Sequence, residues 1–376
     1  MNEIIYLDNN ATTALDPIVA QAVIDELSQV PSNPSSVHRY GRSAQQRLIK
    51  ARDSIAHIFN VKPDELLFTS SGTEALHHLI YSLCSNREKG HIITSDMEHA
   101  AVYATMQHLQ SQGYSVTFLK GSSKGSVDVD AVQQAIKDNT CLIALMSVNN
   151  ETGVKTDIDS IAKLAQKHSI PFLVDGISQL GKEKILIPQG VVGMAFSGHK
   201  IHAPKGVGLA FLRKPFRFLP IFKGGHQEFD ARAGTENLSG IIGMAKAIEI
   251  LNDGLPDYQY KMQKLRDHFE KELKNRLSDV IINGQGLRIC NVSNLTFLNV
   301  DGESLLVNLD RAGILASMGS ACSSGAIEPS RTLLNMGLTT NLAKSSLRFS
   351  LSRMTTKENI DQAIELITSI VNQMRN

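Results

Sequence analysis

The chain has 376 residues, of which 42% are hydrophobic, so it is long enough to form more than one ordinary core, and two domains are expected. Its 38 basic and 37 acidic residues are interspersed and give a net charge of +1, which excludes the charge pattern of a protein that binds nucleic acid or an anionic membrane. No apolar run approaches the roughly 20 residues of a membrane span, and the first residues lack the basic flank and apolar segment of a secretory signal.

The N-terminal region alternates polar loops with two predicted helices. An apolar segment at residues 2–8 runs into a polar loop at residues 9–13. Asp16 followed by Pro17 predicts a helix start, because Asp caps a helix and Pro fits its first turn. Prolines and hydroxyl side chains exclude regular structure over residues 31–36, and a second helix is predicted over residues 41–59.

The middle of the chain alternates strands with helices. Strands are predicted at residues 66–69, 91–94, 115–119, 141–147, 171–174 and 194–196, and helices at residues 73–84, 100–110 and 158–168. This alternation, with nearly continuous apolar strand interiors, is typical of a parallel sheet covered by helices on both faces. Such sheets bind ligands at the carboxyl ends of their strands. Polar clusters follow the predicted strands at residues 70–73, 96–99, 149–151, 175 and 197–200, so we expect them to meet in one cleft.

The C-terminal third has a different pattern. A Gly-rich loop at residues 223–226 precedes a long amphipathic stretch at residues 238–277, which is predicted to link two domains. Strands at residues 292–298 and 346–351 and helices at residues 303–311 and 357–373 then predict a smaller α+β domain.

Lys200 lies at the end of a predicted strand, in Ser197-Gly198-His199-Lys200. Taken alone, such a lysine is more often a loop residue in water. A lysine that loses its charge readily can instead form a Schiff base with an aldehyde cofactor such as pyridoxal phosphate (PLP). The other polar groups favour this second interpretation.

Two motifs fit a cofactor that carries a phosphate and a basic ring. Ser71-Gly72-Thr73-Glu74 opens a helix directly after a strand, where free N–H groups can hold a phosphate, although plain helix capping is the alternative. Asp175 ends a strand, where an acid can pair with a protonated pyridine nitrogen or simply cap a turn.

Two basic residues are further candidates. His99 can stack on a flat ring and move protons near neutral pH, although a lone histidine is more often structural. Arg348 lies inside an apolar strand pattern, so its guanidinium needs a carboxylate, either from the protein or from a substrate.

The four cysteines divide into two groups. None forms a CxxC pair, so neither a disulfide framework nor a metal site is expected, and a reducing cytoplasm suits the chain. Cys84, Cys141 and Cys290 have apolar neighbours and are predicted to be small buried hydrophobes. Cys322 lies among small residues in Gly319-Ser320-Ala321-Cys322-Ser323, a loop predicted to be mobile, so it is the candidate nucleophile.

Motifs along nearly the whole chain resemble those of the cysteine desulfurases, fold-type I PLP enzymes of the class V aminotransferase group. They lie at residues 6–13, 33–38, 68–74, 148–153, 197–200, 232–235, 319–330 and 347–353, and their order and spacing together are specific. The resemblance implies an α/β fold with a large PLP-binding domain at residues 15–255, built on a mostly parallel seven-stranded sheet covered by helices. Residues 1–14 and 256–376 are then a smaller α+β domain that carries the catalytic cysteine loop.

The resemblance also implies roles for the cofactor residues. Lys200 carries PLP, His99 stacks on its ring and assists proton transfer, and Asp175 pairs with the pyridine nitrogen. The remaining cofactor contacts come from Gly72, Thr73, Asn150, Ser197 and His199, with Thr235 supplied by the second subunit of a homodimer.

The substrate roles follow in the same way. L-cysteine is held through its carboxylate by Arg348 and Asn33, with Asn150 nearby, and becomes L-alanine. Cys322 takes up the sulfur as a persulfide and passes it to an acceptor protein. The loop around Cys322, with Glu328 shortly after it, resembles the group that serves iron–sulfur cluster assembly, through a scaffold protein, or tRNA thiolation.

The chain departs from the family at the cofactor. The family has Gln three residues after the pyridine-pairing Asp, bonding the phenolic oxygen of PLP, whereas this chain has Ser178 followed by Gln179. Either side chain can be the one that contacts the cofactor. Two other functions remain open, a selenocysteine lyase or other class V PLP enzyme, and a non-catalytic sulfur-relay homologue.

Overall fold

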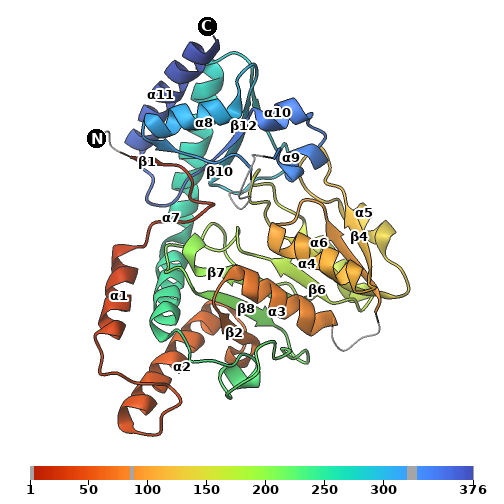
Figure 1. Ribbon diagram of the computed structural model, residues 1–376, viewed down its shortest axis with the longest axis vertical. Coiled ribbons are helices and arrows are strands. Elements are labelled where there is room, and N and C mark those ends of the chain that lie inside the picture. The colour runs from red at the N-terminus through yellow and green to blue at the C-terminus, as the bar shows by residue number, and fades with distance from the viewer. Residues whose placement is uncertain (1–3, 85–88, 320–327, 376) are drawn as a thin grey trace.

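The computed structural model describes residues 4–84, 89–319 and 328–375. Figure 1 shows a large α/β part built on one sheet and a smaller part above it, with one long helix running through both. No helix within the described residues is long and apolar enough to cross a membrane.

The large part is built on a seven-stranded sheet. Its strand order is β2 (Leu66–Thr69), β8 (Gly208–Leu212), β7 (Val191–Ser197), β6 (Phe172–Asp175), β5 (Thr140–Met146), β3 (His91–Ser95) and β4 (Ser115–Leu119). Only β8 runs antiparallel to its neighbours, and the other six strands point the same way. The predicted mostly parallel, seven-stranded α/β fold is therefore confirmed. Strand β8 was not predicted as an element.

The strands alternate their buried side chains between two apolar layers. One layer contains Phe172 and Val174 of β6 and is covered by α2 (Arg39–Phe59), α5 (Val129–Ala135), α6 (Ile158–Lys167) and the first half of α7 (Leu238–Arg276). The opposite layer contains Leu173 and is covered by α3 (Gly72–Cys84) and α4 (Ala100–Ser111). Helices thus cover both faces of the sheet.

The smaller part has its own apolar core. It joins the antiparallel sheet β12 (Ser346–Ser350), β10 (Val292–Phe297) and β9 (Val280–Ile282) to the parallel pair β1 (Ile5–Tyr6) and β11 (Ile314–Leu315). Helices α8 (Gly302–Arg311) and α11 (Lys357–Arg375) pack on this core, and the short helices α9 (Arg331–Asn335) and α10 (Thr340–Lys344) face the large part (Figure 1).

Helix α7 belongs to both cores. Its first half packs on α1 (Pro17–Leu27) and α2, whereas Leu265, Phe269 and Leu273 lie in the core of the smaller part. Pro256 lies inside the helix between these two groups of contacts. The amphipathic stretch predicted at residues 238–277 is thus one helix of 39 residues.

The predicted start of α1 is also confirmed. The Asp16 carboxylate accepts the Ile18 N–H at 2.7 Å, and Pro17 occupies the first turn. The N-terminal segment then links both parts, because the Thr13 N–H donates to the His199 carbonyl while the Asn9 side chain donates to the Ser350 carbonyl.

Candidate active site

A cavity of about 190 Å³ lies at the carboxyl edge of the large sheet, where the strand-end clusters were predicted to meet. The polar residues around it are Asn10, Ser71, Thr73, His99, Asn150, Asp175, Ser178, Ser197, His199, Lys200 and Arg348. They come from the ends of β2, β3, β5, β6 and β7, from the N-terminal segment and from β12. Residues from opposite ends of the sequence therefore share one cavity.

Lys200 is half-buried in the 3₁₀ turn η2 (Gly198–Lys200) that follows β7. Its Nζ donates to the main-chain carbonyls of Asn10 and, at 2.8 Å, of Ala11. Behind it, the buried Lys182 Nζ donates to the Lys200 carbonyl at 2.7 Å. Burial, followed by the charge of Lys200, lowers the pKa of Lys182 to about 8.

Asp175 is buried at the end of β6, where its carboxylate accepts the Ile177 N–H at 2.9 Å. Burial raises the pKa of Asp175 to about 6, although the bond from Ile177 and the charge of Lys200 act in the opposite direction. Burial also raises the pKa of Glu98 to about 8, and the charge of Asp175 adds to this shift. At neutral pH the cavity residue Asp175 is therefore ionised, whereas Glu98, which is buried behind the cavity lining, is protonated.

His99 caps the N-terminus of α4 and lines the cavity. Its Nδ1 accepts the Ala101 N–H at 3.1 Å, so the neutral ring carries its proton on Nε2. Burial lowers the pKa of His99 to about 4, and the charges of Lys200 and Arg331 act in the same direction. His99 is therefore a neutral ring with a fixed tautomer at neutral pH.

The start of α3 and the end of β7 form one wall of the cavity. A side chain at Gly72 would place its Cβ 2.5 Å from Ile177 Cδ1 and 3.1 Å from Ser197 Cβ, so the Ile177 side chain would have to move to accommodate it. Ser71 does cap the helix, because its Oγ accepts the Glu74 N–H at 3.1 Å. The Oγ of Ser197, in contrast, is buried and has no hydrogen-bond partner within the described part of the chain.

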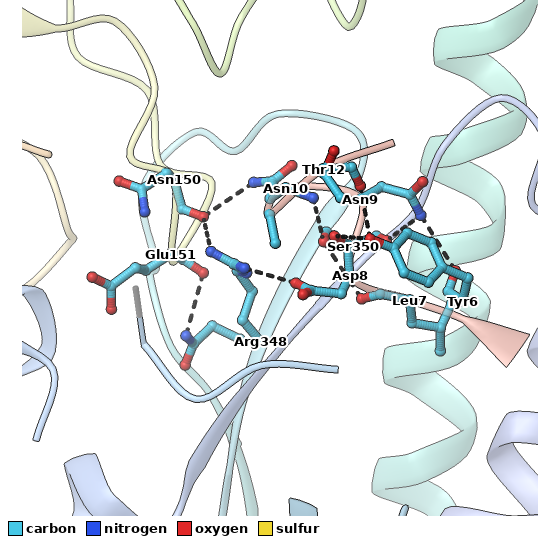
Figure 2. Close-up of polar contacts among 12 residues, drawn as sticks. Tyr6, Leu7, Asp8, Asn9, Asn10, Thr12, Asn150, Glu151, Arg348 and Ser350 are labelled. Carbon is cyan, nitrogen blue, oxygen red and sulfur yellow. Dashed lines mark hydrogen bonds and ion pairs between the residues drawn. The ribbon is translucent and has the colours of Figure 1, made fainter. Parts of the chain in front are cut away.

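Arg348 is 1% exposed and lines the cavity from strand β12 of the smaller part. Figure 2 shows its guanidinium between Asp8 and Asn150, donating to the Asp8 carboxylate at 2.8 Å and to the Asn150 carbonyl at 3.2 Å. The Asn10 side chain donates to the same Asn150 carbonyl at 3.1 Å. The predicted carboxylate partner is thus present within the protein as Asp8, although one guanidinium nitrogen, Nε, has no partner in the described residues.

Three predicted site residues lie outside the residues that line this cavity. Asn33 is exposed, and its side chain accepts the Ser35 N–H at 2.8 Å. Gln179 is half-buried in the turn after β6, whereas its neighbour Ser178 lines the cavity. Thr235 lies with the Gly-rich loop in a separate surface pocket. The prediction for Cys322 falls outside the described residues.

The structure also adds residues that the sequence patterns did not single out. Lys182, Asn10 and Ala11 contact Lys200 from distant or irregular segments, so no local periodicity marks them. The other cysteines behave as predicted, since Cys84, Cys141 and Cys290 are all buried. Burial raises the pKa of the Cys290 thiol to about 11, which makes it a poor nucleophile.

Known proteins are similar to this chain in sequence and in fold. The family described as aminotransferase class-V matches residues 5–363. A cysteine desulfurase of Nostoc sp. (strain PCC 7120 / SAG 25.82 / UTEX 2576) is 40% identical over 375 residues, which cover 99% of this chain and 94% of that protein. Cysteine desulfurase IscS of Dictyoglomus turgidum is 38% identical over 380 residues, which cover 100% of this chain and 96% of that protein.

A solved structure described as a NifS-like protein superposes with a TM-score of 0.92 at 30% identity, covering 98% of this chain and 100% of that chain. Sequence identity and fold thus agree over almost the full length. The chain belongs to the class V aminotransferase family, a family of PLP enzymes, and within it to the cysteine desulfurases.

Proposed function

We propose that this protein converts L-cysteine to L-alanine with PLP and passes the sulfur to an acceptor. The observation that carries the proposal is the meeting of Lys200, Asp175, His99 and Arg348 in one cavity. The relatives named cysteine desulfurases support the same reaction.

The cavity residues fit PLP. Ser197 brings a buried hydroxyl without a partner among the described residues, next to the N-terminus of α3, and these donors suit the phosphate. Asp175 brings a buried carboxylate that suits a protonated ring nitrogen, and Lys200 brings the amine that would hold the aldehyde. When bound, PLP supplies an electron sink for the substrate carbon next to the amine.

The protein's own residues handle the substrate and its protons. Arg348 binds the cysteine carboxylate, with Asn150 beside it, and its burial strengthens this charge pairing. Lys200 moves the proton at the substrate Cα. His99, neutral and protonated at Nε2, assists proton transfer on the cavity side.

We propose Cys322 as the sulfur acceptor, on the sequence motif alone. Its thiolate attacks the sulfur of the bound cysteine and forms an S–S bond. The C–S bond breaks and its electron pair stays on the substrate carbon, which is then protonated to give alanine. Cys322 is left as a persulfide for transfer to an iron–sulfur scaffold protein or to a tRNA-thiolation relay.

Further proposals concern assembly, cofactor contacts and location. Thr235 lies outside the cavity of its own chain, which fits a homodimer in which it contacts the partner's phosphate site. Ser178 lines the cavity and is therefore favoured over Gln179 as the residue near the phenolic oxygen, and Asn33 rests on the resemblance alone. A thiol that must stay reduced between turnovers suits the cytoplasm.

We also propose the domain boundary predicted from the sequence. Residues 15–255 form the PLP-binding domain, and residues 1–14 with 256–376 form the small domain. Ile5 and Leu7 in the small core and Pro256 within α7 support this division.

The test is alanine release and persulfide mapping on the PLP-loaded enzyme. L-cysteine should yield alanine, and mass spectrometry should place the extra sulfur on Cys322. Cys322→Ala should bind PLP but form no persulfide, whereas Cys290→Ala should behave like the wild type because Cys290 is buried. Turnover of selenocysteine alone would indicate a selenocysteine lyase, and PLP binding without any turnover would indicate a relay homologue.

A further inference from the structure

Arg331, the first residue of α9, reaches from the small domain to the turn that carries His99. Its Nε–H donates to the Asp96 carbonyl at 2.8 Å, and its second terminal nitrogen donates to the Glu98 carbonyl. Its guanidinium carbon lies 3.5 Å from the centre of the Tyr103 ring. A planar guanidinium suits this arrangement, because it can bond two carbonyls while it stacks on an aromatic face.

The three residues that Arg331 contacts lie on either side of His99 in the sequence. Asp96 and Glu98 precede it in the turn after β3, and Tyr103 lies one helical turn after it in α4, where its N–H donates to the His99 carbonyl at 3.0 Å. A rotation of this turn would break the bonds to both carbonyls. Arg331 therefore restricts the backbone on each side of His99.

Apolar contacts hold the same two segments together. Met97, between the two bonded carbonyls, is 2% exposed and packs in a small cluster with Leu333 and Met336 of α9 and its end. The Asn335 side chain lies 3.5 Å from the Asp96 carbonyl, the same oxygen that accepts from Arg331.

Helix α9 is itself tied to the other wall of the cavity. The Ser330 hydroxyl donates to the buried Glu151 carboxylate, and the Thr332 hydroxyl donates to its other oxygen at 3.3 Å. Glu151 directly follows Asn150, whose carbonyl accepts from Arg348. Helix α9 is thus a fixed support from which Arg331 can hold the His99 turn.

Charge reinforces this geometry. Lys200 and Arg331, both cationic, act on the His99 ring, and Asp96 and Glu98 flank His99 on its own turn. After burial and Lys200, the positive charge of Arg331 disfavours a protonated ring. Removing Arg331 therefore makes protonation of His99 easier.

We propose that Arg331 is a positioning residue for His99, because it fixes the turn and the start of α4 between which the ring projects into the cavity. Its effect on turnover rests on the proposed desulfurase function. Its effect on the ring of His99 does not, so the two can be tested apart.

The experiment compares three variants of the PLP-loaded enzyme. Arg331→Met removes the positive charge and the hydrogen bonds to the Asp96 and Glu98 carbonyls. Arg331→Lys keeps the charge but loses the planar guanidinium that bonds both carbonyls. Arg375→Met is the matched control, because Arg375 also bonds main-chain carbonyls of the small domain, those of Ser278 at 2.8 Å and Leu298 at 3.0 Å, far from His99. Thermal unfolding reports any general loss of stability in each variant.

Two readouts test the proposal. The kcat for alanine formation should fall by about 10-fold to 100-fold in Arg331→Met, with a smaller loss in Arg331→Lys and little change in the KM for cysteine. NMR titration of ¹⁵N-histidine-labelled enzyme should show a higher His99 pKa in Arg331→Met than in the wild type. If Arg331→Met matched Arg375→Met in both readouts, the proposal would be overturned. A wild-type enzyme that releases no alanine would instead refute the proposed function, while the His99 titration still decides the role of Arg331.

Discussion

Replacing Asp175 with Asn should change stability in opposite directions with and without PLP. The native carboxyl has its pKa raised from 3.8 to about 6, chiefly by burial. A raised acid pKa means that the protonated form stabilises the fold below pH 3.8 and that this stability is lost as the pH rises through about 6. A shift of about two pH units at about 1.4 kcal/mol each amounts to about 3 kcal/mol.

The amide of the Asp175→Asn variant cannot ionise, so the variant does not lose this folding stability as the pH rises. In the cofactor-free protein, the free energy of unfolding of Asp175→Asn relative to the wild type should therefore rise with pH. About half of the effect, roughly 1.5 kcal/mol, should appear between about pH 5 and pH 8. The new side chain keeps an oxygen that can accept the Ile177 N–H, so the comparison isolates the charge.

The PLP-loaded enzyme should respond in the other direction. In the proposed complex the ionised acid is paired with the ring nitrogen, and a hydrogen bond to a charged group contributes about 1.5–3 kcal/mol. Asp175→Asn should accordingly weaken PLP binding by about 10-fold to 150-fold, measured by titration of the cofactor-free protein with PLP.

Urea unfolding at a series of pH values checks the stability half of this prediction. Asp301→Asn serves as the control, since bonds from Ser304 lower the pKa of that exposed helix cap and leave it ionised throughout about pH 5–8. Its difference from the wild type should be flat over this range. A flat difference for Asp175→Asn as well would refute the reasoning that burial destabilises the ionised Asp175 carboxylate.

Three further changes test other parts of the structure. Gly72→Ala places a methyl 2.5 Å from Ile177 Cδ1, so the Ile177 side chain or the start of α3 must move. Because this wall of the cavity is the one proposed to hold the phosphate, PLP binding should weaken by about 10-fold or more, which equilibrium dialysis would measure. Ser178→Gln puts an amide at the cavity and should shift the absorption maximum of the bound cofactor, whereas an unchanged spectrum would argue against a contact at this position. Arg52→Met breaks the buried ion pair with Glu228 and should cost about 3–5 kcal/mol in urea unfolding, and a cost below about 1 kcal/mol would show that the pair is weakly coupled to folding.

Most of the fold could be predicted from the sequence because its strands are short apolar runs. Apolar runs of about three to seven residues predicted six of the seven strands of the main sheet. Strand β8, Gly208–Leu212, has the same apolar character, but its antiparallel pairing with β7 and β2 depends on contacts that no local pattern records. The order of the strands is non-local for the same reason.

Only some residues of the candidate site could be predicted from the sequence. Asp175 and Lys200 could be found because both follow a strand, and the ends of parallel strands meet at one edge. Arg331 gave no such signal, since it contacts residues more than 230 positions away through two carbonyl oxygens. The choice between Ser178 and Gln179 likewise depends on the turn after β6, where the Gln179 N–H donates to the Gly176 carbonyl and Ser178 is the residue at the cavity.

The buried titratable groups in and beside the cavity share one electrostatic character. Burial is the largest cause of the pKa shift in His99, His199, Asp175, Glu98 and Lys182, and in each case it favours the neutral form. A ligand with an anionic phosphate and a cationic ring acts in the opposite direction. Its charges stabilise the ionised form of buried groups of opposite charge, which burial alone disfavours. Binding must then be linked to folding stability, since whatever binds only the native state stabilises it by mass action. Asp175 shows this linkage most clearly, because its ionised carboxylate makes the cofactor-free fold less stable at neutral pH and is the group that we propose to pair with the ring nitrogen of PLP. It lies at the end of a buried strand, where the packed sheet fixes its position.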